Sequence, residues 1–159
     1  MYSIHNIHSC KELSNCFSMF RLRVRDIAHP GIRQFILRTA VLNYLGKCLQ
    51  LQWDDWQNQR MHLRTLQHEG AKISDETEPT DAVHVNAATE AARLALTVAI
   101  EELRGKVQST HKLLQREYNE LFTYMMDKRD LWDSPEYFKA KTALGAANHH
   151  LRMYMTAEK

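Results

Sequence analysis

Large apolar side chains recur at every seventh position through the middle of the chain, and this spacing limits the possible folds more than any other feature. The series consists of five residues, Phe35, Leu42, Leu49, Trp56 and Leu63. A sustained period of seven keeps one stripe of an α-helix turned toward a neighbouring helix, which is the pattern of coiled coils. The spacing predicts a long helix over residues 32–67 that packs against another helix.

A capping box begins an earlier predicted helix. Ser9 is followed three residues later by Glu12, so the two side chains can each accept a hydrogen bond from a free backbone amide at a helix start. The predicted helix covers residues 10–28 and ends before Pro30, which cannot lie inside a helix without breaking it. Its apolar residues alternate at intervals of four and three and share one face: Leu13, Phe17, Phe20, Val24 and Ile27.

Two more helices are predicted in the second half of the chain. A cap at Thr80 or Asp81 begins a helix over residues 82–129, whose apolar positions again alternate at intervals of four and three. Ser134 caps a final helix over residues 134–156.

The segment over residues 69–81 loses the helical periodicity and is predicted to be an acidic loop. Residues 69–90 carry six acidic residues against a single lysine, Lys72. Ser, Thr, Asp and Glu gather there around Pro79, as is typical of a solvated connection.

Together these patterns predict an all-α helical bundle with one domain over residues 1–159. Two long antiparallel helices form a coiled-coil-like hairpin, and two shorter helices pack on it. At about 1.5 Å per residue, the two long helices would reach about 54 Å and about 70 Å, more than a compact domain of this size spans. Either they kink near Gly46 and Gly105, or they form an elongated hairpin whose remaining apolar stripe needs a partner.

No catalytic or cofactor motif is found. The chain contains five glycines and lacks G-x-G-x-x-G, G-x-x-x-x-G-K-[ST] and G-x-S-x-G. It also lacks H-E-x-x-H and the Glu-x-x-His pairs of di-iron bundles. We therefore expect a protein that is not an enzyme and that needs no cofactor.

Four residues near the start of the sequence have side chains that can bind a metal ion. His5, His8, Cys10 and Cys16 lie within twelve residues, but their spacing matches no standard zinc motif. Cys16 also falls beside the apolar stripe of its predicted helix, where a free cysteine behaves as a small hydrophobic residue. We interpret this group as an ordinary chain terminus and expect no metal site.

The cysteine count and the absence of long apolar runs bear on location. Three cysteines, with no C-x-x-C spacing, do not form a disulfide framework. No run of 18 apolar residues is present, and no apolar signal region begins the chain. We expect an intracellular protein without a membrane span, with cytoplasm and organelle both open.

These expectations lead to a non-enzymatic helical adaptor or accessory subunit of a larger protein assembly, binding other subunits or a second copy through its heptad-patterned faces. Six residues are predicted to bind the partner: Leu49, Trp53, Trp56, Leu63, Leu103 and Leu114. The alternative is a helical module that binds nucleic acid or another polyanion. It depends on five arginines in a segment with a net charge of +4 over residues 1–40: Arg21, Arg23, Arg25, Arg33 and Arg38.

Overall fold

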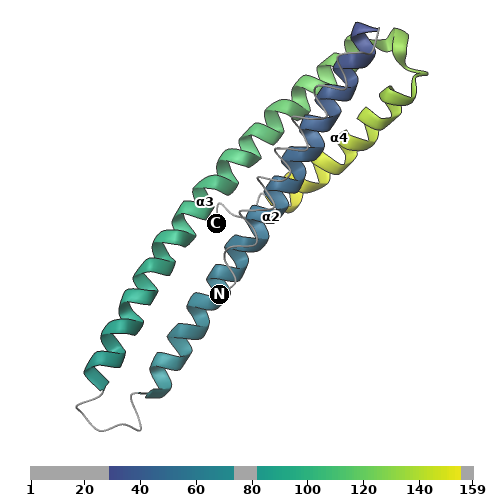
Figure 1. The fold of residues 1–159 in the computed structure, drawn as a ribbon. Helices are drawn as coiled ribbons and strands as arrows, with labels where there is room; N and C mark the ends of the chain where they lie inside the picture. The colour runs from purple at the N-terminus through teal and green to yellow at the C-terminus, as the bar shows by residue number, and fades with distance from the viewer. Residues whose placement is uncertain (1–28, 74–81, 155–159) are drawn as a thin grey trace. The chain divides into compact units, whose positions relative to one another are not determined.

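The computed structural model describes residues 29–73 and 82–154, with side chains described for 29–68 and 87–154. These residues form three α-helices and one 3-10 turn: α2 (Pro30–Ile73), α3 (Ala82–Asp127), η1 (Arg129–Leu131) and α4 (Pro135–Met153) (Figure 1). No strand occurs within the described ranges, so the predicted all-α class is confirmed.

The predicted count of four helices is not met, because the structure describes three α-helices. The helix predicted over residues 10–28 lies outside the described residues. The predicted loop over 69–81 also begins too early. α2 continues to Ile73, since Ala71 and Lys72 are good helix formers and one glycine costs only about 1 kcal/mol in a helix.

The two glycines considered as kink sites lie inside continuous helices. α2 extends through Gly46 and α3 extends through Gly105 without leaving the α-helical conformation. Neither glycine has a positive φ angle. Both helices are therefore continuous through these glycines.

The chain divides into two compact units, which are described separately. Unit 1 comprises Met1–Leu51 and Gln108–Lys159, and unit 2 comprises Gln52–Val107. Within its described part, unit 1 contains the first half of α2, the second half of α3, and all of η1 and α4. Unit 2 contains the remaining halves of α2 and α3.

Unit 1 is a three-helix bundle with a close-packed core. Phe35 of α2 is fully buried and meets the ring of Tyr124 of α3 edge-on, with centroids 5.0 Å apart, and that of Tyr137 of α4 at 5.8 Å. One aromatic side chain of α2 thus contacts both other helices of the unit. The other fully buried large side chains of this unit are Leu42, Leu49, Leu114 and Leu121.

Contacts between the helices establish their directions in unit 1. The Tyr124 hydroxyl donates to the carbonyl of Gly31, and Arg38 pairs with Glu120, so α2 and α3 are antiparallel here. α4 contributes mostly small residues to the core, namely Ala140, Ala143, Leu144 and Ala147. Small side chains let helix axes approach closely, which explains how a short helix fits against two longer ones.

The start of α4 follows the capping chemistry predicted from sequence. The Ser134 Oγ accepts a hydrogen bond from the backbone amide of Tyr137 at 3.2 Å, and Pro135 occupies the first helical position. This arrangement satisfies one of the amides that a helix start leaves free.

Unit 2 has a much thinner core than unit 1. Its buried hydrophobic residues, among those described, are Trp56, Ile100 and Val107. The Arg93 guanidinium reaches across to the carbonyl of Leu66 at 3.1 Å. None of the described helices is long and apolar enough to span a membrane.

Candidate functional site

Half of the predicted partner-binding residues pack inside the chain itself. Leu49 and Leu114 have no exposed surface, and Trp56 retains 7%. In this conformation these three side chains stabilise the fold and offer no surface to a partner. Their heptad positions identified the core correctly, but a heptad pattern cannot distinguish an internal neighbour from an external one.

The other three predicted residues, Trp53, Leu63 and Leu103, are half-buried in the structure. Each therefore keeps some surface. Trp53 already lies against Trp56, with ring centroids 5.1 Å apart, and the guanidinium of Arg60 lies 4.6 Å from the Trp56 ring centroid. The rings of Trp53 and Trp56 therefore already contact neighbouring side chains of the same helix.

The interior of unit 2 is partly polar. The Oε1 atoms of Gln52 and Gln59 are buried and have no hydrogen-bond partner, and the same is true of the Trp56 indole nitrogen and the Arg93 Nε. A buried polar atom without a partner costs free energy, because it has lost its bonds to water. The pairing of α2 with α3 in unit 2 is therefore only weakly stabilised by its own interior.

The arginines predicted to bind a polyanion are not brought together by the described structure. Arg21, Arg23 and Arg25 lie outside the described residues, and Arg33 is half-buried. Arg38 is committed to internal contacts. Its guanidinium pairs with Glu120 at 3.1 Å and lies 5.3 Å from the Tyr124 ring centroid.

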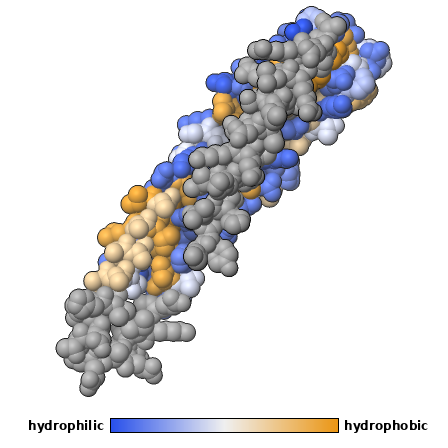
Figure 2. Space-filling view, viewed as in Figure 1, coloured by the Kyte–Doolittle hydropathy of each residue, from blue (hydrophilic) through white to orange (hydrophobic). Residues whose placement is uncertain are grey.

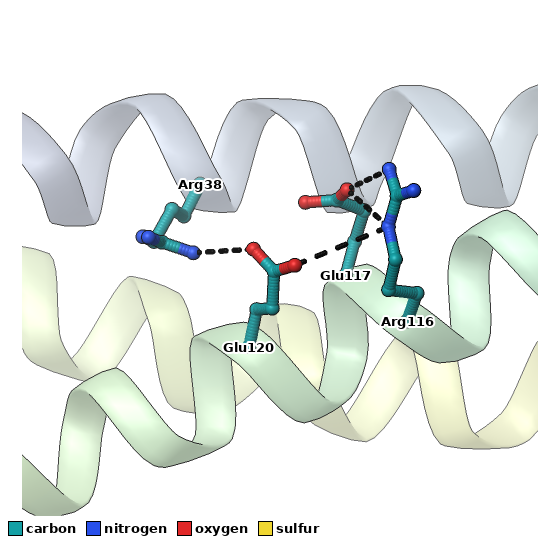
Figure 3. A network of polar contacts seen from close by, with 4 residues as sticks. All are labelled: Arg38, Arg116, Glu117 and Glu120. Carbon is teal, nitrogen blue, oxygen red and sulfur yellow. Dashed lines mark hydrogen bonds and ion pairs between the residues drawn. The ribbon is translucent and has the colours of Figure 1, made fainter.

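Figure 3 shows the charged network around Arg38 on α2 and three residues of α3. Glu120 pairs with Arg38 and also lies 3.9 Å from Arg116, which pairs with Glu117 at 2.8 Å. The hydrogen bond and charge of Glu117 raise the pKa of the Arg116 guanidinium. Two arginines and two glutamates cancel in charge, so the network holds α2 to α3 without attracting anions.

A shallow groove of about 450 Å³ adjoins this network. The residues that line it are Arg38, Arg116, Asn119, Glu120, Thr123, Tyr124 and Asp127. Burial raises the pKa of the Tyr124 hydroxyl, with the charge of Arg38 acting in the opposite direction. The charges of Arg38, Arg116 and Glu120 on the wall of this groove are already engaged in ion pairs.

An exposed apolar stripe runs along the first half of α3. It consists of Ala87, Ala91, Leu94 and Val98, at intervals of four, three and four, all exposed. Leu94 is 62% exposed and Val98 is 68% exposed. We call these four residues the α3 face. Figure 2 shows hydrophobic surface gathered over this part of the chain.

The α3 face lies opposite the stripe that packs inside unit 2. Leu96, Ile100 and Leu103 belong to the inner stripe, and all three are at least half-buried. Successive residues turn about 100° around a helix, so Leu96 and Val98 point about 200° apart. The first half of α3 is thus apolar on two opposite sides, and the structure covers only one of them.

The α3 face was not among the predicted binding residues, although the sequence carries a signal for it. The start of the third predicted helix is rich in Ala and Leu, and its inner stripe accounted for the periodicity. Counting the apolar residues left over after the inner stripe would have identified a second row at the same helical spacing.

No group of three or more His, Cys, Asp or Glu side chains within the described ranges is arranged to hold a metal ion. The group formed by His5, His8, Cys10 and Cys16 lies outside those ranges. Comparisons of the chain with known protein families, with curated proteins and with solved structures found no match.

Proposed function

We propose that this chain is a non-enzymatic accessory or adaptor subunit that binds an amphipathic helix of another protein along the α3 face. The observation that carries the proposal is the exposure of Leu94 and Val98, 62% and 68%, on a helix whose opposite side is already packed. Rows of exposed apolar residues at helical spacing are typical of helix-in-groove recognition.

The composition of the α3 face determines the shape of helix that fits it. Ala87 and Ala91 leave room at one end, while Leu94 and Val98 project at the other. A complementary helix carries large apolar residues opposite the alanines and smaller ones opposite Leu94 and Val98. Full burial of a Leu or Val side chain contributes about 1.5–3 kcal/mol, so the two large residues can support a moderate, reversible association.

Charges beside the α3 face indicate basic residues on the partner. Glu90, Glu101 and Glu102 have side chains that are 61%, 65% and 65% exposed. By helical geometry each lies within about 70° of the middle of the face. Their intrahelical cations, such as Lys106 at 2.8 Å from Glu102, lie farther from it. A partner helix flanked by Lys or Arg would match this acidic border.

The test uses the double substitution Leu94→Glu with Val98→Glu, and Met61→Glu as a matched control. Met61 is 63% exposed in the same unit but on the other helix. Wild type and both variants serve as baits in the native source, and recovered proteins are quantified by mass spectrometry. Circular dichroism verifies that helical content is unchanged, which we expect because all three side chains are exposed.

We expect at least one protein to be recovered tenfold less with the double variant and equally well with Met61→Glu. Equal recovery of every protein with both variants would contradict the proposal, and so would the absence of any partner of the wild type. Light scattering supplies a further outcome. A dimer of the wild type that the double variant abolishes would make a second copy the occupant, against the heterologous partner proposed here.

A further inference from the structure

The side of α4 that is directed away from α2 and α3 carries a row of exposed residues (Figure 1). Five of them lie within an arc of about 100° around the helix, and the connection that follows η1 adds two more. We call these seven exposed residues the α4 face: Trp132, Asp133, Phe138, Lys141, Thr142, Gly145 and His149. Two of them are large aromatic side chains, because Trp132 is 63% and Phe138 is 54% exposed.

The ring of Phe138 is held in place by the core of unit 1. It meets the ring of Tyr137 edge-on, with centroids 6.4 Å apart, and Tyr137 in turn contacts the buried Phe35 at 5.8 Å. Phe138 therefore extends the internal aromatic cluster onto the surface. An exposed aromatic side chain that is already positioned loses little freedom on binding, which is typical of an interface anchor.

Gly145 lies on the same face, in the interior of α4. Glycine lowers the stability of a helix relative to alanine, and nothing within the described chain requires it here. Its φ angle is not positive, and an added Cβ would meet nothing within 4 Å. The next residue, Ala146, is also small and exposed. These two residues leave a shallow recess on the helix, into which a side chain of another molecule can fit.

The α4 face is complementary to itself about Phe138. The projecting Trp132 lies six residues before Phe138, and the recess at Gly145 lies seven residues after it. The charges follow the same arrangement, with Asp133 five residues before and Lys141 three residues after. Neither charged side chain makes an ion pair with another described residue. A surface with opposite features on either side of its centre fits a second copy of the same surface, turned by 180°.

We infer that two copies of this chain associate through the α4 face as a two-fold symmetric dimer. The two α4 helices pack antiparallel with Phe138 at the centre. Trp132 of each copy then fills the recess at Gly145 of the other, and Asp133 of each lies near Lys141 of the other. One helix face is a small interface, so the dimer is weak and reversible, with a Kd in roughly the micromolar range. The surface is separate from the α3 face, and the inference does not depend on the proposed function.

Leucine substitution of two glycines tests the inference with a matched control. Gly145→Leu fills the recess, and Gly105→Leu makes the same change at an exposed position of α3 in unit 2. An added Cβ meets nothing within 4 Å at either glycine, so both variants should keep the helical content of the wild type in circular dichroism. Analytical ultracentrifugation of the full chain over a concentration series gives each Kd. We expect Gly145→Leu to weaken the dimer by about tenfold or more and Gly105→Leu to change it by less than about twofold.

A reciprocal charge exchange tests the two-fold arrangement. Asp133→Lys and Lys141→Glu each bring like charges together twice in the dimer, so each should weaken association by about threefold or more. Both substitutions in one chain make the charges opposite again and should restore the wild-type Kd. A double variant that associates no better than the single variants would overturn the inferred pairing.

A wild type that stays monomeric over the whole series would overturn the inference, as would equal effects of Gly145→Leu and Gly105→Leu. A dimer that is abolished by Leu94→Glu with Val98→Glu would also overturn it, because the association would then use the α3 face. Capture of a partner and dimerisation are separate measurements. The proposed function fails on the first, and this inference fails on the second.

Discussion

Alanine substitution of the two mid-helix glycines, Gly46 and Gly105, should have opposite consequences, although the chemical change is the same. Alanine is favoured over glycine in a helix interior by about 1 kcal/mol, because glycine loses more backbone entropy on folding. At Gly105 an added Cβ meets nothing within 4 Å. Gly105→Ala should therefore raise the free energy of unfolding by about 1 kcal/mol, or about 3 °C in Tm for a chain of this size.

At Gly46 the same methyl group meets α4. An added Cβ would lie 3.1 Å from Cδ2 and 3.5 Å from Nε2 of His150. The first distance is shorter than an ordinary carbon contact, so either the imidazole or α4 must move. Overpacking of this kind costs about 1–3 kcal/mol, which offsets or exceeds the helical gain. Gly46→Ala should be neutral or destabilising by up to about 2 kcal/mol.

A double-mutant cycle separates the two contributions. In a His150→Ala background the obstacle is gone, and Gly46→Ala should then recover the full gain of about 1 kcal/mol. Urea denaturation followed by circular dichroism gives the free energies of unfolding for all four members of the cycle, with Gly105→Ala as the reference. If Gly46→Ala stabilises the wild type as much as Gly105→Ala does, the close packing of α4 against α2 at this position is refuted.

Three further predictions concern unit 1. Leu114→Ala removes a fully buried side chain and should cost about 2–5 kcal/mol in urea denaturation, while Leu113→Ala, at a residue 36% exposed, should cost less than about 1 kcal/mol. Ser134→Ala removes the cap of α4 and should cost about 1 kcal/mol; a change within error would show that the cap is dispensable. Burial, with a smaller contribution from the charge of His149, lowers the pKa of His150. The unfolded chain therefore binds that proton more tightly, so stability should be complete above about pH 6.5 and fall as the pH drops below it. His150→Gln should weaken this dependence, and an unchanged pH profile would contradict the assignment.

Much of the local structure was predictable because it depends on short-range chemistry. The cap at Ser134 was predicted and is confirmed by its hydrogen bond to the amide of Tyr137. The heptad series predicted the core of α2, and Phe35, Leu42 and Leu49 have at most 1% exposure. Both results follow from the regular spacing of a helix, which requires no knowledge of the neighbouring elements.

The surfaces could not be assigned in the same way. Leu94 and Leu96 are the same residue type and lie two residues apart in the sequence, yet Leu94 is exposed and Leu96 is half-buried. A helix that is apolar on two opposite sides contains no local signal for which side faces inward. Arg38 likewise resembled a free cation until the structure paired it with Glu120, 82 residues away.

The sequence by itself determined that the described part of the chain is helical, approximately where its helices begin, and which stripe of α2 is apolar. Propensity, capping and periodicity act within a few residues, so they can be read from the sequence directly. Only the tertiary structure decided which apolar stripes are buried in the core and which remain exposed on the surface. That choice depends on neighbours brought together from distant parts of the chain. For this reason the proposed binding surface is the exposed α3 face, and no longer includes buried core residues such as Leu49 and Leu114.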